Sequence, residues 1–218
     1  MSEELDRRPI AARNTWASQA IAKWLVGRDL SANAISLAGM GAGILAGLFF
    51  ALTWWLPSGA AIFWVLGAIC VQLRLAANMF DGMVAVARGT ASPLGELYNE
   101  VPDRISDSAV LAGVGIAAEG NWGLGLAAAL AAMATAYVRA VGKGAGAKSD
   151  FSGPMAKPHR MFLVTVGAVW LAFLPGYWPE QVGVSLPAAL LLVITVGSLL
   201  TVARRLWRIA QALTAGPA

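Results

Sequence analysis

The residues best suited to chemistry lie in one stretch of the chain, between two apolar segments. Residues 78–107 contain five of the 12 acidic residues. These five are Asp81, Glu96, Glu100, Asp103 and Asp107. The apolar segments on both sides are long enough to cross a bilayer. Because a carboxylate at a membrane boundary is costly to desolvate, such a cluster indicates a functional site by default.

Two pairs of asparagine and aspartate in this stretch have helical spacing. Asn78 and Asp81 are three residues apart, so they share one face of a helix. Asn99 and Asp103 are four apart and share a face of the next helix. Only the loop 89–92 separates the two helices, which we therefore expect to be antiparallel, with these faces converging. Oxygen ligands from two helices suit a hard divalent cation such as Mg²⁺ or Mn²⁺.

Small residues and one cation complete this predicted site. The small residues Gly82, Ala85 and Gly95 lie at the same level and leave room for a flat or bulky group between the helices. Arg74 lies one turn before Asn78 on the same face. It could pair with a phosphate or with Asp81, or it could form a structural ion pair.

The composition indicates an all-α integral membrane protein. Hydrophobic residues make up 58% of the 218 residues and charged residues 13%, about half the charged fraction of a soluble domain. We predict six transmembrane helices in one membrane domain, residues 33–218, preceded by an N-terminal amphipathic interfacial helix, 13–27, and a flexible N-terminus, 1–12. The predicted spans are 33–54, 59–88, 93–118, 122–142, 157–175 and 184–203.

The helix predicted over 13–27 has one apolar face. This face comprises Trp16, Ala20, Ile21, Trp24 and Leu25. The segment is too short and polar to span a bilayer, so we expect it to lie in the membrane interface with this face down. An ordinary amphipathic helix packed on the bundle is an alternative, and the two are compatible.

Other local signals concern helix ends and packing. Asp29 or Ser31 can cap the first span, and Ser92 the third. Pro102 predicts a bend in the third span. Glycines recur every fourth residue in the first span, at 39, 43 and 47, which predicts a flat face for close helix contact.

The distribution of basic residues predicts the orientation. The loops near residues 55, 120 and 178 contain no Lys or Arg, and nearly all 16 Lys and Arg fall on the opposite side. The positive-inside rule places that side in the cytoplasm, together with both termini and the acidic stretch. The net charge of +4 therefore indicates cytoplasmic loops rather than nucleic-acid binding. The single cysteine, Cys70, forms no intrachain disulfide, and one Cys with one His makes no zinc site.

The acidic stretch resembles the signature of the CDP-alcohol phosphatidyltransferase family, D-x2-D-G-x2-A-R-x8-G-x3-D-x3-D. Aligned on Asp81, this chain has N-x2-D-G-x2-A-V-x8-G-x3-N-x3-D, with every spacing kept. Asn78 and Asn99 stand where the signature has Asp, and Val86 stands where it has Arg. The six spans, the interfacial helix and an Asn-x-Ile-Ser start to the first span also resemble the family.

The resemblance implies transfer of a phosphatidyl group from a CDP-linked lipid, such as CDP-diacylglycerol, to an alcohol acceptor, with release of CMP in phospholipid biosynthesis. It implies one or two Mg²⁺ or Mn²⁺ ions, a bacterial inner membrane, contact with membrane lipids and a homodimer. By position, Asp81 is a metal ligand, and Asp103 is a metal ligand and the general base. Asn78 and Asn99 occupy the other ligand positions, and Gly82, Ala85 and Gly95 shape the cytidine-diphosphate pocket.

The two asparagines bear on whether this chemistry persists. An Asn carbonyl can ligate a metal but brings no charge, so we expect weaker binding and one ion instead of two. Glu96, Glu100 and Asp107 could compensate as auxiliary ligands. The alternative is a non-catalytic membrane protein that binds a lipid or nucleotide at a degenerate site. A small transporter is disfavoured, because the charges cluster at one surface rather than near the midplane.

A second, basic cluster lies at the cytoplasmic ends of the fourth and fifth predicted spans. Its members are Arg139, Lys143, Lys157, His159 and Arg160, of which the last three are expected at the cytoplasmic surface. In the family, basic residues in such places hold an acceptor phosphate, which favours a phosphorylated or otherwise anionic acceptor. Ordinary positive-inside flanking or headgroup binding is the alternative. As the lone histidine, His159 is better explained as a hydrogen-bonding partner than as a ligand.

Arg88 could replace the arginine that the signature has at position 86. It follows Ala87, so an Ala-Arg pair recurs two residues later. Two residues on a helix correspond to a rotation of about 200°. Arg88 could therefore bind phosphate in place of the missing arginine only if the helix has ended there.

Overall fold

The computed structural model describes residues 11–90, 93–174, 178 and 183–214, with the backbone alone for Ala11, Pro93 and Glu96. A 3₁₀ segment, Ala11–Asn14, is followed by α1 (Trp16–Gly27), α2 (Ala32–Trp55), a 3₁₀ turn (Pro57–Gly59), α3 (Ala60–Ala87), α4 (Pro93–Ala117), α5 (Trp122–Gly144), α6 (Lys157–Phe173) and α7 (Leu186–Thr214). No strand occurs in these described ranges. The all-helical prediction is confirmed.

Four segments are long and apolar enough to cross a membrane. They are α2, the 3₁₀ turn with α3 (Pro57–Ala87), α5 and α7. The two other long helices are less apolar or shorter, because α4 carries the acidic stretch and α6 has 17 residues. The six predicted spans therefore correspond to six helices, four of which have the length and composition of a membrane span.

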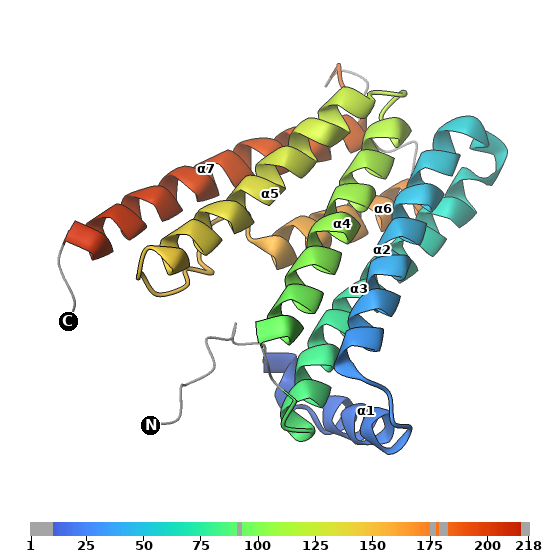
Figure 1. The fold of residues 1–218 in the computed structure, drawn as a ribbon. Coiled ribbons are helices and arrows are strands. Elements are labelled where there is room, and N and C mark those ends of the chain that lie inside the picture. The colour runs from blue at the N-terminus through green and yellow to red at the C-terminus, as the bar shows by residue number, and fades with distance from the viewer. Residues whose placement is uncertain (1–10, 91–92, 175–177, 179–182, 215–218) are drawn as a thin grey trace.

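The helices form two connected groups. Figure 1 shows α2, α3 and α4 side by side, with α1 across the end where α3 finishes and α4 begins. The second group has α5 along α7, and α6 joins the groups by packing on α3 and α7. The antiparallel relation of α3 and α4 follows from the short loop between them. The ends that carry the asparagine and aspartate pairs therefore lie together, next to α1 and the start of α2.

The predicted glycine face of α2 is a close helix contact. A Cβ added at Gly43 would overlap Ser106 of α4, and one added at Gly47 would overlap the backbone at Ala109. The missing side chains let the backbones of α2 and α4 touch. Van der Waals packing at such small-residue faces is a main source of helix association in membranes.

The first helix begins later than the sequence predicted. Thr15 is its N-cap and accepts a hydrogen bond from the Ser18 N–H at 3.3 Å, whereas the preceding residues are 3₁₀. Ser18 and Ala22 are the buried face, and α1 packs on α3. Trp16 and Trp24 on the predicted apolar face are 84% and 57% exposed. The helix thus packs on the bundle through its small residues and presents its tryptophans outward.

Helix ends show further differences. Ser31 is the cap of α2, accepting from the Ala34 N–H at 3.1 Å, and Asp29 instead forms an ion pair outside the helix. The last helix continues to Thr214 rather than ending at 203. The predicted Ser92 cap, the flexible segment 1–10 and the predicted turn at 175–177 and 179 lie outside the described residues. Helix α4 runs through Pro102 without a break in its assignment, and the bend there stays a prediction.

Candidate functional site

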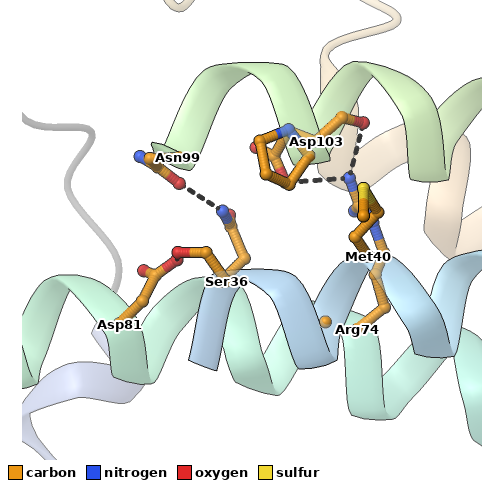
Figure 2. Close-up of a pocket in the computed structure, with 9 residues that line it drawn as sticks. Ser36, Met40, Arg74, Asp81, Asn99 and Asp103 are labelled. Atoms are coloured by element: carbon orange, nitrogen blue, oxygen red, sulfur yellow. Dashed lines mark hydrogen bonds and ion pairs between the residues drawn. The ribbon is translucent and has the colours of Figure 1, made fainter. Parts of the chain in front are cut away.

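A small pocket lies where α2, α3 and α4 meet. It is lined by Ser36, Gly39 and Met40 of α2, Arg74, Asn78 and Asp81 of α3, and Asn99, Pro102 and Asp103 of α4. Figure 2 shows the side chains of α4 directed toward those of α2 and α3. The structure therefore brings together all four residues at the metal-ligand positions of the signature. Two helical periods and one short loop were enough to predict this convergence.

The two asparagines contact each other across the pocket. The Asn78 amide Nδ2 donates a hydrogen bond to Asn99 Oδ1 at 2.8 Å, which links α3 to α4. This bond fixes which way the Asn78 amide points, because its nitrogen faces Asn99 and its oxygen faces away. Asn78 Oδ1 accepts a hydrogen bond from the Lys157 ammonium of α6 at 2.9 Å.

Asp81 is buried and is held by a residue of α2. The Ser36 hydroxyl donates to Asp81 Oδ2 at 2.6 Å, and both residues are less than a tenth exposed. Ser36 is the serine of the Asn-x-Ile-Ser pattern at the start of the first predicted span, and the sequence did not assign it to the site. The available signal was a hydroxyl within an apolar span, which must find a partner inside the bundle.

Asp103 is surrounded by positive charge. Arg74 Nη2 lies 3.1 Å from Asp103 Oδ1, and Arg104 Nη2 lies 3.6 Å from Oδ2. The Lys157 ammonium forms a short ion pair with the same Oδ2. Three cations from α3, α4 and α6 thus converge on one carboxylate, and the side chains of Asp103 and Lys157 remain 12% and 13% exposed.

A buried ion-pair network continues behind the pocket. Arg74 Nη2 lies 2.5 Å from Asp107 Oδ1, and Arg160 Nη2 lies 3.4 Å from Asp107 Oδ2. The predicted surface position of Arg160 is wrong, because Arg160 is 1% exposed and also donates to the Met155 carbonyl. Asp107 is paired in this network and does not line the pocket. Removing one partner of a buried ion pair leaves the other charge unpaired and destabilises the fold by about 3–5 kcal/mol.

Arg74 therefore pairs with carboxylates of α4 and not with Asp81. Its Nε also donates to the Ser106 hydroxyl at 2.9 Å. The structural alternative for Arg74 is confirmed to that extent. Yet Arg74 also lines the pocket, and its Nη1 makes no hydrogen bond with the described part of the chain. One guanidinium nitrogen is left for a further acceptor.

The other residues of the predicted basic cluster do not enter the pocket. Arg139 pairs with Glu100 at 2.6 Å and lies over the Phe151 ring. This pair also accounts for Glu100, one of the suggested auxiliary ligands. Lys143 and His159 are exposed. Among the described members of the cluster, Lys157 is the one whose side chain contacts residues that line the pocket.

Arg88 lies beyond the end of α3, as the sequence required for any replacement of the missing arginine. Its guanidinium donates to the Val26 carbonyl at 3.1 Å and pairs with Asp29 at 3.0 Å, so it holds the segment after α1. Val86 is 52% exposed. Three small residues were predicted to shape a nucleotide pocket, and none of them lines the cavity: Gly82, Ala85 and Gly95. The Glu96 side chain lies outside the described residues.

The oxygen atoms in the pocket limit what metal it can hold. Within the described ranges, no group of three or more His, Cys, Asp or Glu side chains is close enough to hold a metal ion. The available donors are two carboxylates, Asp81 and Asp103, and two amide carbonyls, Asn78 and Asn99. Carboxylate and amide oxygens are what Mg²⁺ and Mn²⁺ prefer, and this set fits one divalent ion.

Known proteins with similar sequences include phosphatidylinositol phosphate synthases and an inner membrane protein. No family model matches the chain. It is 29% identical over 205 residues to the phosphatidylinositol phosphate synthase of Mycobacteroides abscessus, covering 90% of this chain and 86% of that protein. It is 26% identical over 152 residues to the inner membrane protein YnbA of Escherichia coli, covering 70% of this chain and 73% of that protein.

Crystal structures of Mycobacterium tuberculosis phosphatidylinositol phosphate synthase share the fold. The complex with manganese and citrate superposes with a TM-score of 0.72 at 24% identity, over 91% of each chain. The structure with CDP-DAG bound gives 0.68 at 23% identity, over 87% of this chain and 92% of the other. The arrangement of helices around the pocket is therefore common to these chains.

Proposed function

We propose that the chain belongs to the CDP-alcohol phosphatidyltransferase family and transfers a phosphatidyl group from a CDP-linked lipid to an alcohol, with release of CMP, in phospholipid biosynthesis. One observation carries the proposal. The four residues at the ligand positions of the signature, which come from two helices, line a single pocket. The synthase relatives span nearly the whole chain and support the same reaction class.

Each polar residue that lines the pocket has a role in this reaction. Asp103 accepts the proton of the acceptor hydroxyl. The hydroxyl oxygen of the acceptor bonds to the lipid-side phosphorus of the donor, and the bond from that phosphorus to CMP breaks. Arg74 lines the pocket and offers its Nη1 to a phosphate oxygen. Ser36 keeps Asp81 turned toward the pocket. A bound Mg²⁺ or Mn²⁺, held by Asp81, Asp103 and the asparagine carbonyls, would screen phosphate charge and stabilise the leaving group.

The membrane arrangement is part of the proposal. The six long helices cross a bacterial inner membrane, and the chain forms a homodimer surrounded by lipid. Both termini and the pocket face the cytoplasm, on the side that collects the Lys and Arg residues. Helix α1 lies in the interface, which the outward exposure of Trp16 and Trp24 supports.

The acceptor is a phosphorylated or otherwise anionic alcohol. Lys143 and His159 are exposed, and Arg139 is partly exposed beside Glu100. These side chains stand on α5 and α6, outside the pocket, where an incoming acceptor could approach. Arg160 does not bind the acceptor, because it is buried and forms an ion pair with Asp107.

The proposal is tested by CMP release from the purified chain in lipid nanodiscs. The assay contains CDP-diacylglycerol, Mn²⁺ or Mg²⁺ and a panel of acceptors: glycerol 3-phosphate, inositol phosphate, inositol, serine and glycerol. We expect turnover with an anionic acceptor and none for Asp103→Asn. Absence of turnover with every acceptor, together with retained CDP-diacylglycerol binding, would instead establish the non-catalytic alternative.

A further inference from the structure

The Lys157 ammonium contacts two residues that line the pocket, Asn78 and Asp103, at two of the four ligand positions of the signature. We propose that Lys157 is a built-in second cation of this site, so that the chain binds one divalent ion and uses the ammonium in place of another. The inference rests on the proposed function, since it concerns the same site. It makes Lys157 a residue that acts on the donor phosphates rather than on the acceptor.

The contacts of Lys157 resemble those of a bridging cation. Its Nζ contacts Asn78 Oδ1 of α3 at 2.9 Å and Asp103 Oδ2 of α4. One acceptor thus comes from each helix of the signature, at the first and last of its four ligand positions. The side chain is 13% exposed, so these contacts are made largely out of solvent.

The two asparagines make the site compatible with this ammonium. Asn78 Nδ2 donates to Asn99 Oδ1 at 2.8 Å. Two carboxylates in those positions would repel at that distance unless a divalent ion lay between them. With amides the two side chains bond to each other, and the hydrogen bond turns Asn78 Oδ1 toward Lys157. Both asparagines thus reduce the negative charge relative to the signature, and Lys157 compensates part of what remains.

The backbone around Lys157 fixes it in this position. Lys157 is the first residue of α6, and Pro158 restricts the first turn. One turn along, Arg160 is buried and pairs with Asp107 while donating to the Met155 carbonyl at 2.7 Å. The ion-pair network behind the pocket therefore anchors the start of α6 against α4, and this directs Lys157 at Asp103.

Charge then limits the number of ions. The signature has four carboxylates, whereas this pocket has Asp81 and Asp103, and Asp103 is already paired with the ammonium. Asp81, the carbonyl of Asn99 and the remaining lone pairs of Asp103 are then the ligands for one divalent ion. A lysine ammonium has three donors, so it can hold Asp103 and a donor phosphate oxygen at once.

The test counts Mn²⁺ ions bound to the chain in nanodiscs, without nucleotide, by titration followed with electron paramagnetic resonance. We expect one Mn²⁺ per wild-type chain and two per chain in the triple variant Asn78→Asp, Asn99→Asp, Lys157→Met, with magnetic coupling between the two ions. Any wild-type stoichiometry other than one, or a folded triple variant that binds one ion, would overturn the inference.

The single variant Lys157→Met keeps the inference testable if the triple variant does not fold. Removing the ammonium frees Asp103 Oδ2, so Mn²⁺ should bind about tenfold more tightly or better, the scale on which ligand charge tunes cation affinity. Lys157→Arg, which keeps the charge, is the matched control and should bind one ion with wild-type affinity. Unchanged Mn²⁺ affinity in folded Lys157→Met would contradict the inference.

These readouts are independent of turnover. If the chain binds one Mn²⁺ with the expected response to Lys157→Met but releases no CMP, the proposed function fails and the cation assignment stands. If the chain releases CMP but binds two Mn²⁺, the proposed function stands and the cation assignment fails.

Discussion

Two of the buried arginines, Arg205 and Arg74, lie in different groups of helices, and their partners differ. In the α5–α7 group, Arg205 of α7 is 4% exposed and donates to two backbone carbonyls, Thr135 O at 2.6 Å and Ser152 O at 2.9 Å. In the α2–α4 group, Arg74 is 1% exposed and pairs with the carboxylates of Asp103 and Asp107.

The difference separates an arginine that holds the fold from one that also belongs to a site. Backbone carbonyls are fixed dipoles, so Arg205 ties α5 and the segment after it to α7. Arg74 balances ionised carboxylates, lines a pocket and has one nitrogen without a partner in the described chain. Buried charge alone therefore does not identify the site. Convergence of opposite charges on a cavity does.

The largest expected effect comes from Asp103→Asn. Loss of the general base should lower the rate of CMP release about 100-fold or more. The matched control is Asp150→Asn, since Asp150 lies in the other group and pairs with Arg208 at 3.4 Å. This control should release CMP at nearly the wild-type rate. Equal activities of the two variants would show that the base is elsewhere.

The second expected effect concerns the two arginines themselves. Arg74→Met removes the buried cation that Asp103 and Asp107 share, so it should lower the free energy of unfolding by about 3–5 kcal/mol and abolish turnover. Arg205→Met leaves carbonyls without a donor and should destabilise by about 1–3 kcal/mol, with the turnover of folded protein unchanged. Thermal unfolding and CMP release, measured on each variant, distinguish the two. An active Arg74→Met would remove Arg74 from the site.

A smaller effect is expected from Ser36→Ala. Loss of the 2.6 Å hydrogen bond to Asp81 should lower the free energy of unfolding by about 1.5–3 kcal/mol, and it should raise the KM for the donor severalfold. The control is Ser198→Ala. Ser198 of α7 is fully buried, and its hydroxyl has no hydrogen-bond partner in the described chain. Its removal should leave stability unchanged or higher, as followed by thermal unfolding.

The smallest effect is on acid stability. Burial by itself raises the pKa of Asp150, but hydrogen bonds from Ser152 and the charge of Arg208 outweigh it, so the pKa is lowered. A lowered folded-state pKa stabilises the chain above the ordinary value of about 4 and loses that contribution as the pH falls below it. Unfolding curves of Asp150→Asn should therefore change less between about pH 5 and pH 3 than those of wild type. Parallel curves would contradict the lowered pKa.

The sequence predicted the features that depend on local spacing. Helical period and a four-residue loop placed Asn78, Asp81, Asn99 and Asp103 on facing surfaces, and the glycine spacing predicted a flat face of α2 for close helix contact. Helical period, loop length and glycine spacing all depend on residues that are close together in the chain. Helix ends were less predictable because polar residues continue α7 beyond the apolar run.

Contacts between distant helices could not be predicted in the same way. Lys157 meets Asp103 across 54 positions of sequence, and Arg160 meets Asp107 across 53. Their pairing depends on how α6 packs on the bundle and on the rotamers of long side chains. Basic residues were therefore expected at the surface by the positive-inside rule, although Arg160 is buried. The position of Ser36 opposite Asp81 likewise depends on the α2–α3 contact.

The backbone contact between α2 and α4 has a mechanical consequence. Because Gly43 and Gly47 bring the two backbones together, no layer of side chains lies between them that could compress or repack. Gly47 is 11 residues from Ser36 along α2, a distance of about 16 Å. The two helices should tilt as one rigid body when bilayer thickness fluctuates. Ser36 of α2 holds Asp81. The distance between Asp81 and Asp103 of α4 should therefore change little when the surrounding lipid moves.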